Sequence, residues 1–432
     1  MRRKLAATLA CLLLFSSCNY IPSGIESLLT APQLNERQAE VDLALRSTLN
    51  LDGIQYKYPL GGDYRSPFVF YDLDGDGSEE AVIFFTYEND TANVRAKVLK
   101  QLQPGQWVSA YDIAGNGSEV EFIQFSHLKS QTGSCIIIGW QNLRRGEATL
   151  GVYSFENGAF ETEVLEPYSK YMLLSDPESG LEYIALVAEN SGTGMFFVSL
   201  LRKMGGSVAV ADSIQLTRGV SEILQICRGL LWDGSEALYV DEFRSDQLYA
   251  TEAVRITPAG LFPAVDLDYF DDLYSATFRE REVLSADINN DGIIEIPQLA
   301  QLPGYDTDEL PLVEYMQMTE KGYKIVASAV VNQPAGYRVF FPERWADIVT
   351  VVRQPENNEW RFCRMDSDTG QPSTELLRIQ RYAVGDYRDR FTDDYILLEK
   401  KGAFEYKAYI PPVAGDSLAV TQEEVKSMFQ LL

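Results

Sequence analysis

A glycine-marked loop that recurs five times along the chain constrains its fold more than any other feature of the sequence. Each marker glycine precedes a run of apolar, strand-forming residues, and successive markers are 56, 47, 54 and 58 residues apart: Gly77, Gly133, Gly180, Gly234 and Gly292. Short strand-like segments separated roughly every eight to twelve residues by Gly, Asn, Asp or Pro are typical of a sandwich, barrel or propeller. Each interval holds about four strands with their turns, which favours a propeller. The sequence therefore predicts a mainly β, propeller-like array of about five four-stranded blades over residues 61–334.

Two of the five loops are strongly acidic. The segment FYDLDGDGSEEAVIFF (70–85) places five acidic residues directly before an apolar strand, and SADINNDGIIEIP (285–297) repeats the spacing 215 residues later. Carboxylates this close repel one another and are costly to hold beside a buried strand without a cation. Calcium prefers six to eight oxygen ligands, which alternate side chains of a tight loop can supply. The loops therefore predict calcium in a structural role, and the alternative is an Asp-Gly hairpin turn with solvated carboxylates.

The sequences DLDGDGSEEAV and DINNDGIIEI resemble the calcium loops of FG-GAP and VCBS-type repeats, the propeller repeats also found in integrin α chains. The pattern of that family is Asp-x-Asp/Asn-x-Asp-Gly-x-x-Asp/Glu. The resemblance implies two sets of ligands, with Ser78 and Ile293 contributing backbone carbonyls: Asp72, Asp74, Asp76, Ser78 and Glu80 in the first loop, and Asp287, Asn289, Asp291, Ile293 and Glu295 in the last. The three middle loops lack the full set of ligands.

The first twenty residues, MRRKLAATLACLLLFSSCNY, indicate export. A basic start is followed by an apolar stretch that is too short to span a membrane, and by small residues ahead of Cys18. The segment LLLFSSC resembles the lipobox of bacterial lipoproteins, in which the cysteine is acylated and becomes the mature N-terminus. This resemblance implies a signal peptide over residues 1–17, a lipidated Cys18, a tether over 18–33 and an extracytoplasmic, lipid-anchored protein. An ordinary signal peptide with an incidental cysteine is the alternative.

The two ends of the mature chain carry helical patterns. Residues 34–60 are predicted to form a helix and a lead-in, because Asn35 and Gln38 make a capping pair ahead of apolar residues at helical spacing. Residues 335–432 are predicted to form a small α+β domain that closes with VTQEEVKSMFQLL, where Thr421 and Glu424 make a capping box. The apolar face of that helix is expected to cover the sheet beside it, and a docking helix for a partner is the alternative.

Charge and cysteine content exclude several classes of function. The chain has 63 acidic and 37 basic residues, so its formal charge is −26, or −29 after loss of residues 1–17. That charge repels nucleic acid and anionic lipid surfaces and is relieved by bound divalent cations. Beyond the N-terminal region only Cys135, Cys227 and Cys363 remain, without any CxxC, which argues against a disulfide framework and a zinc site.

Compact catalytic motifs are absent from the sequence, which contains no GxSxG, Walker loop, dinucleotide-binding fingerprint or HExxH. The single histidine, His127, is interpreted as a turn or surface residue. The acidic, aromatic stretch VDLDYFDDLYSATF (265–278) is the best candidate for paired carboxylates of glycoside chemistry. We interpret it instead as a solvated loop that packs Tyr269, Phe270 and Tyr274 against a blade.

Two functions from different classes follow from these observations. The first is a non-enzymatic, calcium-stabilised propeller lipoprotein, expected to be a monomer, that binds a protein or glycan through its blade loops. The alternative is a secreted carbohydrate-active enzyme on the same fold, with carboxylates as acid and base. The lack of a compact catalytic motif favours the first, although propellers host both kinds of function.

Overall fold

A computed structural model of the 432-residue chain describes nine stretches: residues 34–49, 53–88, 90–156, 159–177, 179–265, 267–306, 309–384, 395–413 and 415–432. The predicted signal peptide (1–17), Cys18 and the tether lie outside the described residues. Within the described residues, no helix combines the length and the apolar character needed to cross a membrane.

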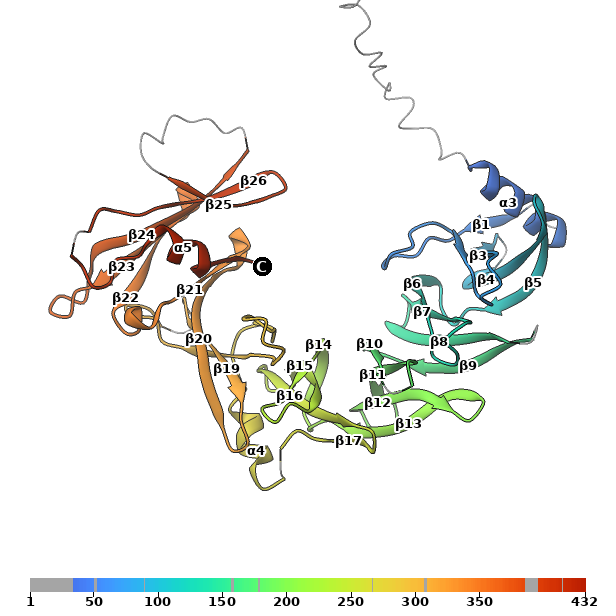
Figure 1. The fold of residues 1–432 in the computed structure, drawn as a ribbon, viewed down its shortest axis with the longest axis horizontal. Coiled ribbons are helices and arrows are strands. Elements are labelled where there is room, and N and C mark those ends of the chain that lie inside the picture. The colour runs from blue at the N-terminus through green and yellow to red at the C-terminus, as the bar shows by residue number, and fades with distance from the viewer. Residues whose placement is uncertain are drawn as a thin grey trace, which may run out of the picture. The chain divides into compact units, whose positions relative to one another are not determined.

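The described chain is mainly β and contains six antiparallel sheets, numbered here in chain order (Figure 1). Sheet 1 contains β1 (Ile54–Tyr56), β2 (Phe68–Tyr71), β3 (Glu80–Tyr87), β4 (Asp90–Gln103) and β5 (Gln106–Ala114). Sheet 2 contains β6 (Glu119–Ser126), β7 (Cys135–Asn142), β8 (Glu147–Glu156) and β9 (Ala159–Pro167). Sheet 3 contains β10 (Lys170–Ser175), β11 (Glu182–Asn190), β12 (Met195–Met204) and β13 (Ser207–Gln215).

Sheets 4 to 6 continue the same plan, with one late strand returning to sheet 5. Sheet 4 contains β14 (Val220–Leu230), β15 (Glu236–Arg244), β16 (Tyr249–Thr257) and β17 (Gly260–Pro263). Sheet 5 contains β18 (Ile296–Ala300), β19 (Leu312–Met318), β20 (Tyr323–Asn332), β21 (Tyr337–Phe340) and β27 (Phe429–Leu431). Sheet 6 contains β22 (Val349–Gln354), β23 (Glu359–Met365), β24 (Pro372–Ala383), β25 (Ile396–Lys401) and β26 (Phe404–Tyr409). The described helices are α3 (Glu36–Leu49), α4 (Leu267–Ser275) and α5 (Gln422–Met428), with short 3-10 turns η1 (Gln333–Ala335), η2 (Glu343–Trp345) and η3 (Pro355–Asn357).

The glycine-marked loops occupy the same place in successive sheets. In sheets 1 to 4 the marker glycine lies between the first two strands of the four-stranded meander, and in sheet 5 it lies just before β18. The sequence period therefore corresponds to one antiparallel sheet, as the spacing of the glycines predicts. No closed barrel or propeller is detected in the part of the chain that the structure describes.

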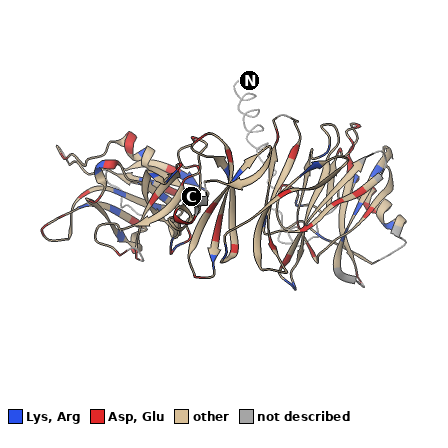
Figure 2. Ribbon diagram, turned by 90° about the horizontal axis from the view of Figure 1, so that it is seen from below, with Lys and Arg blue, Asp and Glu red and all other residues tan. Residues whose placement is uncertain are grey.

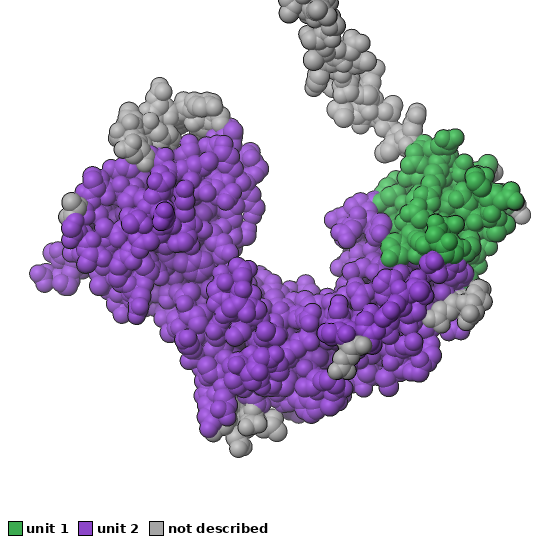
Figure 3. All heavy atoms as spheres, in the orientation of Figure 1, with its two compact units in different colours: residues 1–58, 66–72, 76–115 green, residues 59–65, 73–75, 116–432 purple. Residues whose placement is uncertain are grey.

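The described residues form two compact units (Figure 3). Unit 1 comprises residues 1–58, 66–72 and 76–115, and it contains α3 and sheet 1. Unit 2 comprises residues 59–65, 73–75 and 116–432, and it contains the other five sheets with α4 and α5.

The core of unit 1 confirms the predicted N-terminal helix. Gln38 N donates to Asn35 Oδ1 at 2.8 Å and Asn35 N donates to Gln38 Oε1 at 3.1 Å, so the capping pair is reciprocal. One turn further on, Val41 and Leu45 are fully buried against sheet 1, in a cluster that includes Ile83. Burial of one helix face thus fixes α3 on the sheet that carries the first acidic loop.

In unit 2, consecutive sheets share hydrophobic cores. One cluster joins sheets 2 and 3, a second joins sheets 3 and 4, a third joins sheets 4 and 5 through α4, and the largest joins sheets 5 and 6 through α5. Sheets 2 to 6 are therefore packed against one another in chain order, and the last acidic loop precedes β18, which contributes Ile296 to one of these cores.

Three elements differ from the sequence-based expectation. The stretch around residues 265–278, expected to be a loop, contains the helix α4, in which Tyr274 is buried beside Leu273. The C-terminal helix ends at Met428, because Phe429–Leu431 pairs with β21 as a strand. The expected boundary at residue 335 falls between β20 and β21, which are neighbours in sheet 5.

The capping box predicted at the C-terminal helix is present. Glu424 N donates to Thr421 Oγ1 at 3.2 Å, and Thr421 N donates to Glu424 Oε2 at 2.8 Å. Val425 and Met428 point into the core shared by sheets 5 and 6. The helix therefore covers the sheets beside it, as its apolar face predicts.

Candidate functional site

The first acidic loop links β2 to β3 and turns through two glycines. Gly75 and Gly77 have φ values of 74° and 88°, which L side chains rarely adopt. Gly77 N donates to Asp72 Oδ2 at 2.9 Å and so closes the turn. A Cβ at Gly75 would also lie 2.1 Å from the Thr132 carbonyl oxygen. The glycines are thus required by the backbone of the loop, and the carboxylates are carried on that fixed frame.

Three of the four predicted carboxylates of this loop converge. One ligand oxygen from each of Asp72, Asp74 and Glu80 lies within 4.8 Å of the others. Glu80 is only 2% exposed, whereas the two aspartates are partly exposed. Carboxylate oxygens are ligands that calcium takes, so these three side chains could supply part of the six to eight oxygens of a calcium site.

Asp76, the fourth predicted ligand, is engaged by a lysine. Lys100 Nζ on β4 donates to Asp76 Oδ2 at 3.0 Å and lies 3.7 Å from Glu80 Oε1. The hydrogen bond from Lys100, and that from Ser78 N, hold the pKa of Asp76 below its usual value. The structure therefore places an ammonium group next to the predicted site, and a bound cation would compete with it for Asp76 and Glu80.

The last acidic loop, ahead of β18, reproduces the turn of the first. Gly292 N donates to Asp287 Oδ2 at 2.9 Å, in the same geometry as Gly77 with Asp72, and Ile293 N donates to Asp291 Oδ1 at 2.8 Å. The two loops that share a sequence pattern thus share a backbone structure.

The carboxylates of the last loop are bridged by amide groups. Asn289 Nδ2 donates to Asp291 at 3.0 Å and to Glu295 at 3.1 Å, and Gln317 Nε2 from β19 donates to the same two carboxylates at 2.7 Å each. Asp287, Asp291 and Glu295 do not form a second cluster of the kind found in the first loop among the described residues. The side-chain amides of Asn289 and Gln317 therefore bridge Asp291 and Glu295 in this structure.

The pKa values of two carboxylates in this last loop are shifted in opposite directions. Glu295 is fully buried, and burial raises its pKa above the usual value against the opposing hydrogen bonds from Ile288 N and Gln317. Burial acts in the same direction on Asp291, but the hydrogen bonds from Ile293 N, Gln317 and Asn289 outweigh it and lower the pKa of that carboxyl. Glu295 is thus the group that a cation would most strongly deprotonate.

In the middle loops, which lack the full set of predicted ligands, the acidic residues that remain pair with other groups of the protein. In sheet 4, Arg255 Nη1 from β16 donates to Asp233 Oδ2 at 2.6 Å. Hydrogen bonds from Ser235 and from Arg255 lower the pKa of Asp233 to about 2. In sheet 3, Glu182 accepts hydrogen bonds from Ser126 Oγ and from the backbone N–H of His127. Arg255 therefore places a positive charge next to the carboxylate of this loop, as Lys100 does in sheet 1.

The single histidine lies in one of these loops. His127 Nδ1 is 3.2 Å from the Gly133 carbonyl oxygen, so the ring spans the loop that joins β6 to β7. A hydrogen bond from an imidazole to a backbone carbonyl fixes the loop, which agrees with the interpretation of His127 as a turn residue.

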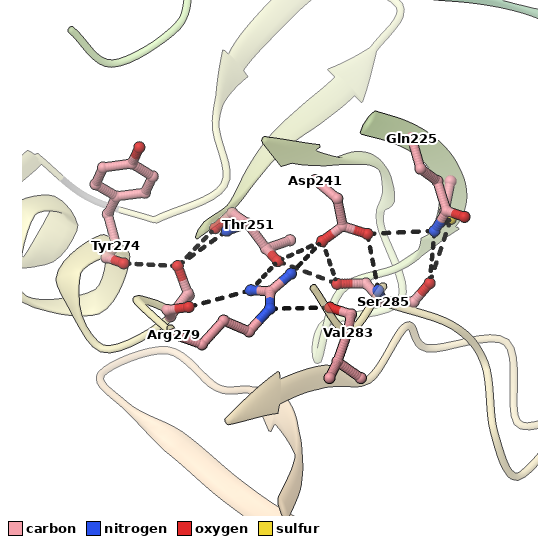
Figure 4. A network of polar contacts seen from close by, with 9 residues as sticks. Gln225, Asp241, Thr251, Tyr274, Arg279, Val283 and Ser285 are labelled. Carbon is pink, nitrogen blue, oxygen red and sulfur yellow. Dashed lines mark hydrogen bonds and ion pairs between the residues drawn. The ribbon is translucent and has the colours of Figure 1, made fainter. Parts of the chain in front are cut away.

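A buried polar network on sheet 4 lies outside all sequence-based predictions (Figure 4). Arg279 Nη2 and Asp241 Oδ1 are 3.0 Å apart, and the two side chains are 0% and 1% exposed. Asp241 also accepts hydrogen bonds from Thr251 Oγ1 and from the N–H and Oγ of Ser285, while Arg279 Nε donates to the Val283 carbonyl. The network ties β15 and β16 to the segment that leads into the last acidic loop at residue 287.

Two glutamates beside this network are buried as well. Glu242 is 0% exposed and accepts a hydrogen bond from Tyr274 on α4, and Glu252 is 5% exposed and accepts one from Thr217 N at 2.8 Å. Burial raises the pKa of Glu242 to about 8 and that of Glu252 to about 7, against the opposing hydrogen bonds. Sequence reasoning missed these groups because their burial depends on packing between distant strands and α4.

No protein-family model and no curated protein matches the chain. Among solved structures, the crystal structure of Sqt1 from Chaetomium thermophilum is similar over 69% of this chain and 83% of that chain, with 13% sequence identity and a TM-score of 0.33. A likeness at this TM-score carries no conclusion about the fold or the site of this chain.

Proposed function

We propose that the chain is an extracytoplasmic, lipid-anchored protein in which calcium stabilises a propeller-like array of sheets, and that it acts as a binding or scaffold module for a protein or glycan. The convergence of Asp72, Asp74 and Glu80 in the first loop carries the calcium part of this proposal. The succession of antiparallel sheets, with sheets 2 to 6 packed each on the next, supports the propeller-like array.

The role of calcium in this proposal is to pin the start of a sheet. The triad lies where β2 turns into β3, and Glu80 is the first residue of β3. An ion there offsets the repulsion between carboxylates that would otherwise face one another beside a buried strand. The last loop takes the same role in the proposal.

Chelation of calcium is expected to lower the melting temperature of the mature protein by a few degrees. For dissociation constants of about 10⁻⁴ to 10⁻³ M, calcium near 1 mM stabilises the native state by about 0.4–1.4 kcal/mol per site. Asp72→Ala and Asp287→Ala should each remove part of the response, and magnesium should substitute poorly because it demands a smaller octahedral site. Differential scanning calorimetry in calcium, magnesium and chelator measures this.

The control for that experiment is Asp176→Ala, in a middle loop where Asp176 accepts a hydrogen bond from Ser179 Oγ at 2.7 Å. This variant should keep the full calcium response. Melting curves of the wild type that coincide in calcium and in chelator would contradict the proposal.

Cys18→Ala is expected to release the protein from the membrane fraction or to block its processing. The motivation is the Ser-Ser-Cys ending of the apolar N-terminal stretch. Membrane fractionation and mass spectrometry of the mature N-terminus measure the result. A mutant that still fractionates with membranes, together with a wild type that carries no lipid, would show that the anchor is wrongly assigned.

A further inference from the structure

A cavity of unit 2 lies where sheets 5 and 6 meet, and no step of the proposed function uses it. Its volume is about 380 Å³, within the range of small-molecule sites. Lining residues come from the end of β20 with η1, from β22 to β24, and from the segments around residues 281 and 309. Three arginines are among them: Arg281, Arg353 and Arg381.

The cavity lining contains two carboxylates, and both are already paired. Glu309 lies 2.6 Å from Arg353 Nη2, and Glu359 lies 2.5 Å from the Nε of Arg361, which is outside the lining. The lining thus contains three arginines and two glutamates.

Arg381 is held in place by groups that carry no negative charge. Its Nη1 donates to the Pro334 carbonyl at 3.0 Å, and its guanidinium lies 4.7 Å from the centre of the Phe404 ring. A guanidinium that is positioned by neutral groups is suited to an incoming oxyanion.

The strands of sheet 6 invert the charge balance of the whole chain. β22 to β26 contain eight basic residues and four acidic ones, whereas the chain has 37 basic and 63 acidic residues. Figure 2 shows basic segments on the strands near the C-terminus. Over residues 349–409 as a whole there are 10 basic and 11 acidic residues, so this part of the sequence is much less acidic than the chain.

We propose that this cavity binds a small organic molecule that carries a carboxylate or a phosphate group. Guanidinium groups recognise both oxyanions through paired N–H donors, which a lysine cannot reproduce. Gln333, Gln354 and Trp360 also line the cavity, and such a mixture of polar and apolar residues suits a small ligand. This site is independent of calcium and of the proposed acidic loops.

Isothermal titration calorimetry of the mature protein at constant ionic strength tests the proposal with two probes, inorganic phosphate and glucuronate, and with glucose as the neutral comparison. We expect saturable heat with at least one of the two anions and none with glucose. Saturation by phosphate alone identifies a phosphate site, and saturation by glucuronate alone identifies a carboxylate site. The absence of saturable heat with both anions would overturn the proposal.

Arg381→Gln is expected to weaken binding of the responding anion by about tenfold or more, because it removes charge-assisted hydrogen bonds. Arg145→Gln is the matched control, since Arg145 is 72% exposed and lies 3.8 Å from Glu147 in sheet 2. Equal affinities in the two variants would overturn the assignment to this cavity.

Two further variants keep the test decisive. If circular dichroism shows that Arg381→Gln does not fold, Arg281→Gln replaces it, because Arg281 lines the same cavity from a separate segment. Asp72→Ala should bind the anion with the same affinity as the wild type, because the cavity does not depend on the acidic loops. The anion test therefore stands or fails separately from the calcium test.

Discussion

Replacing Arg279 by methionine is expected to lower the free energy of unfolding by about 3–5 kcal/mol, the usual cost of removing one partner of a buried ion pair. The mutation leaves Asp241 as a buried charge that is 1% exposed, with its remaining hydrogen bonds from Thr251 and Ser285. Urea denaturation measures the loss. The effect is large because the desolvation of Asp241 is no longer offset by an opposite charge at 3.0 Å.

Arg228→Met is the matched control. Arg228 also pairs with an acidic residue on sheet 4, Glu236, but the two side chains are 45% and 24% exposed. Exposed pairs contribute about 0–1 kcal/mol, so this variant should differ little from the wild type. A loss in Arg279→Met no larger than in the control would show that the network does not stabilise sheet 4.

Raising the pH from 5 to 8 is expected to destabilise the protein, and Glu242→Gln should remove much of that dependence. The pKa of Glu242 is raised from 4.5 to about 8, so the folded state keeps a proton that the unfolded state releases over this window. Stability is therefore fully present below pH 4.5 and is lost as the pH rises toward 8. At 1.36 kcal/mol for each pKa unit, the loss is at most about 5 kcal/mol.

The surroundings of Glu242 decide how this titration proceeds. Tyr274 donates a hydrogen bond to it, Arg244 Nη1 lies 3.9 Å away, and the charge of Glu252 raises its pKa further. Glu252, with a pKa of about 7, contributes to the same pH window and with the same sign. Asp233, with a pKa lowered to about 2, acts with the opposite sign and only in acid.

Unfolding titrations at pH 5, 6.5 and 8 measure this prediction, with Glu147→Gln as the control because its carboxylate is 64% exposed. Glu242→Gln should be more stable than the wild type at pH 8 and similar to it at pH 5. If the two proteins show the same loss between pH 5 and 8, Glu242 is not protonated in the folded state.

Local signals in the sequence were sufficient for the parts of the fold that depend on neighbouring residues. The Asn35–Gln38 capping pair places the start of α3, and the marker glycines place the turns before β3, β7, β11 and β15. Capping and positive φ involve residues that are close in the chain, so their pattern survives in sequence alone.

Contacts between distant residues could not be predicted in this way. The partner of Asp241 lies 38 residues further along the chain, and in a sequence with 63 acidic residues nothing distinguishes that one aspartate. The C-terminal helix stops at Met428 because β21 offers an unpaired edge to Phe429–Leu431, which helical periodicity cannot show.

The acidic loops contain one feature that the local sequence predicts and others that depend on distant strands. The spacing of Asp72, Asp74 and Glu80 predicts their convergence, which the structure shows. The pairing of Asp76 with Lys100 depends on the register between β3 and β4, and the bridging of Asp291 and Glu295 by Gln317 depends on β19. A motif therefore gives the candidate ligands, and the adjacent strands decide which of them are available.

Direct titration of calcium into the mature protein, after exhaustive chelation, tests the central claim. We expect saturable binding with a dissociation constant of about 10⁻⁴ to 10⁻³ M, weakened or reduced in stoichiometry by Asp72→Ala and unchanged by Asp176→Ala. Absence of saturable calcium binding in the wild type, or binding that Asp72→Ala leaves intact, would contradict the assignment of the first loop as a calcium site.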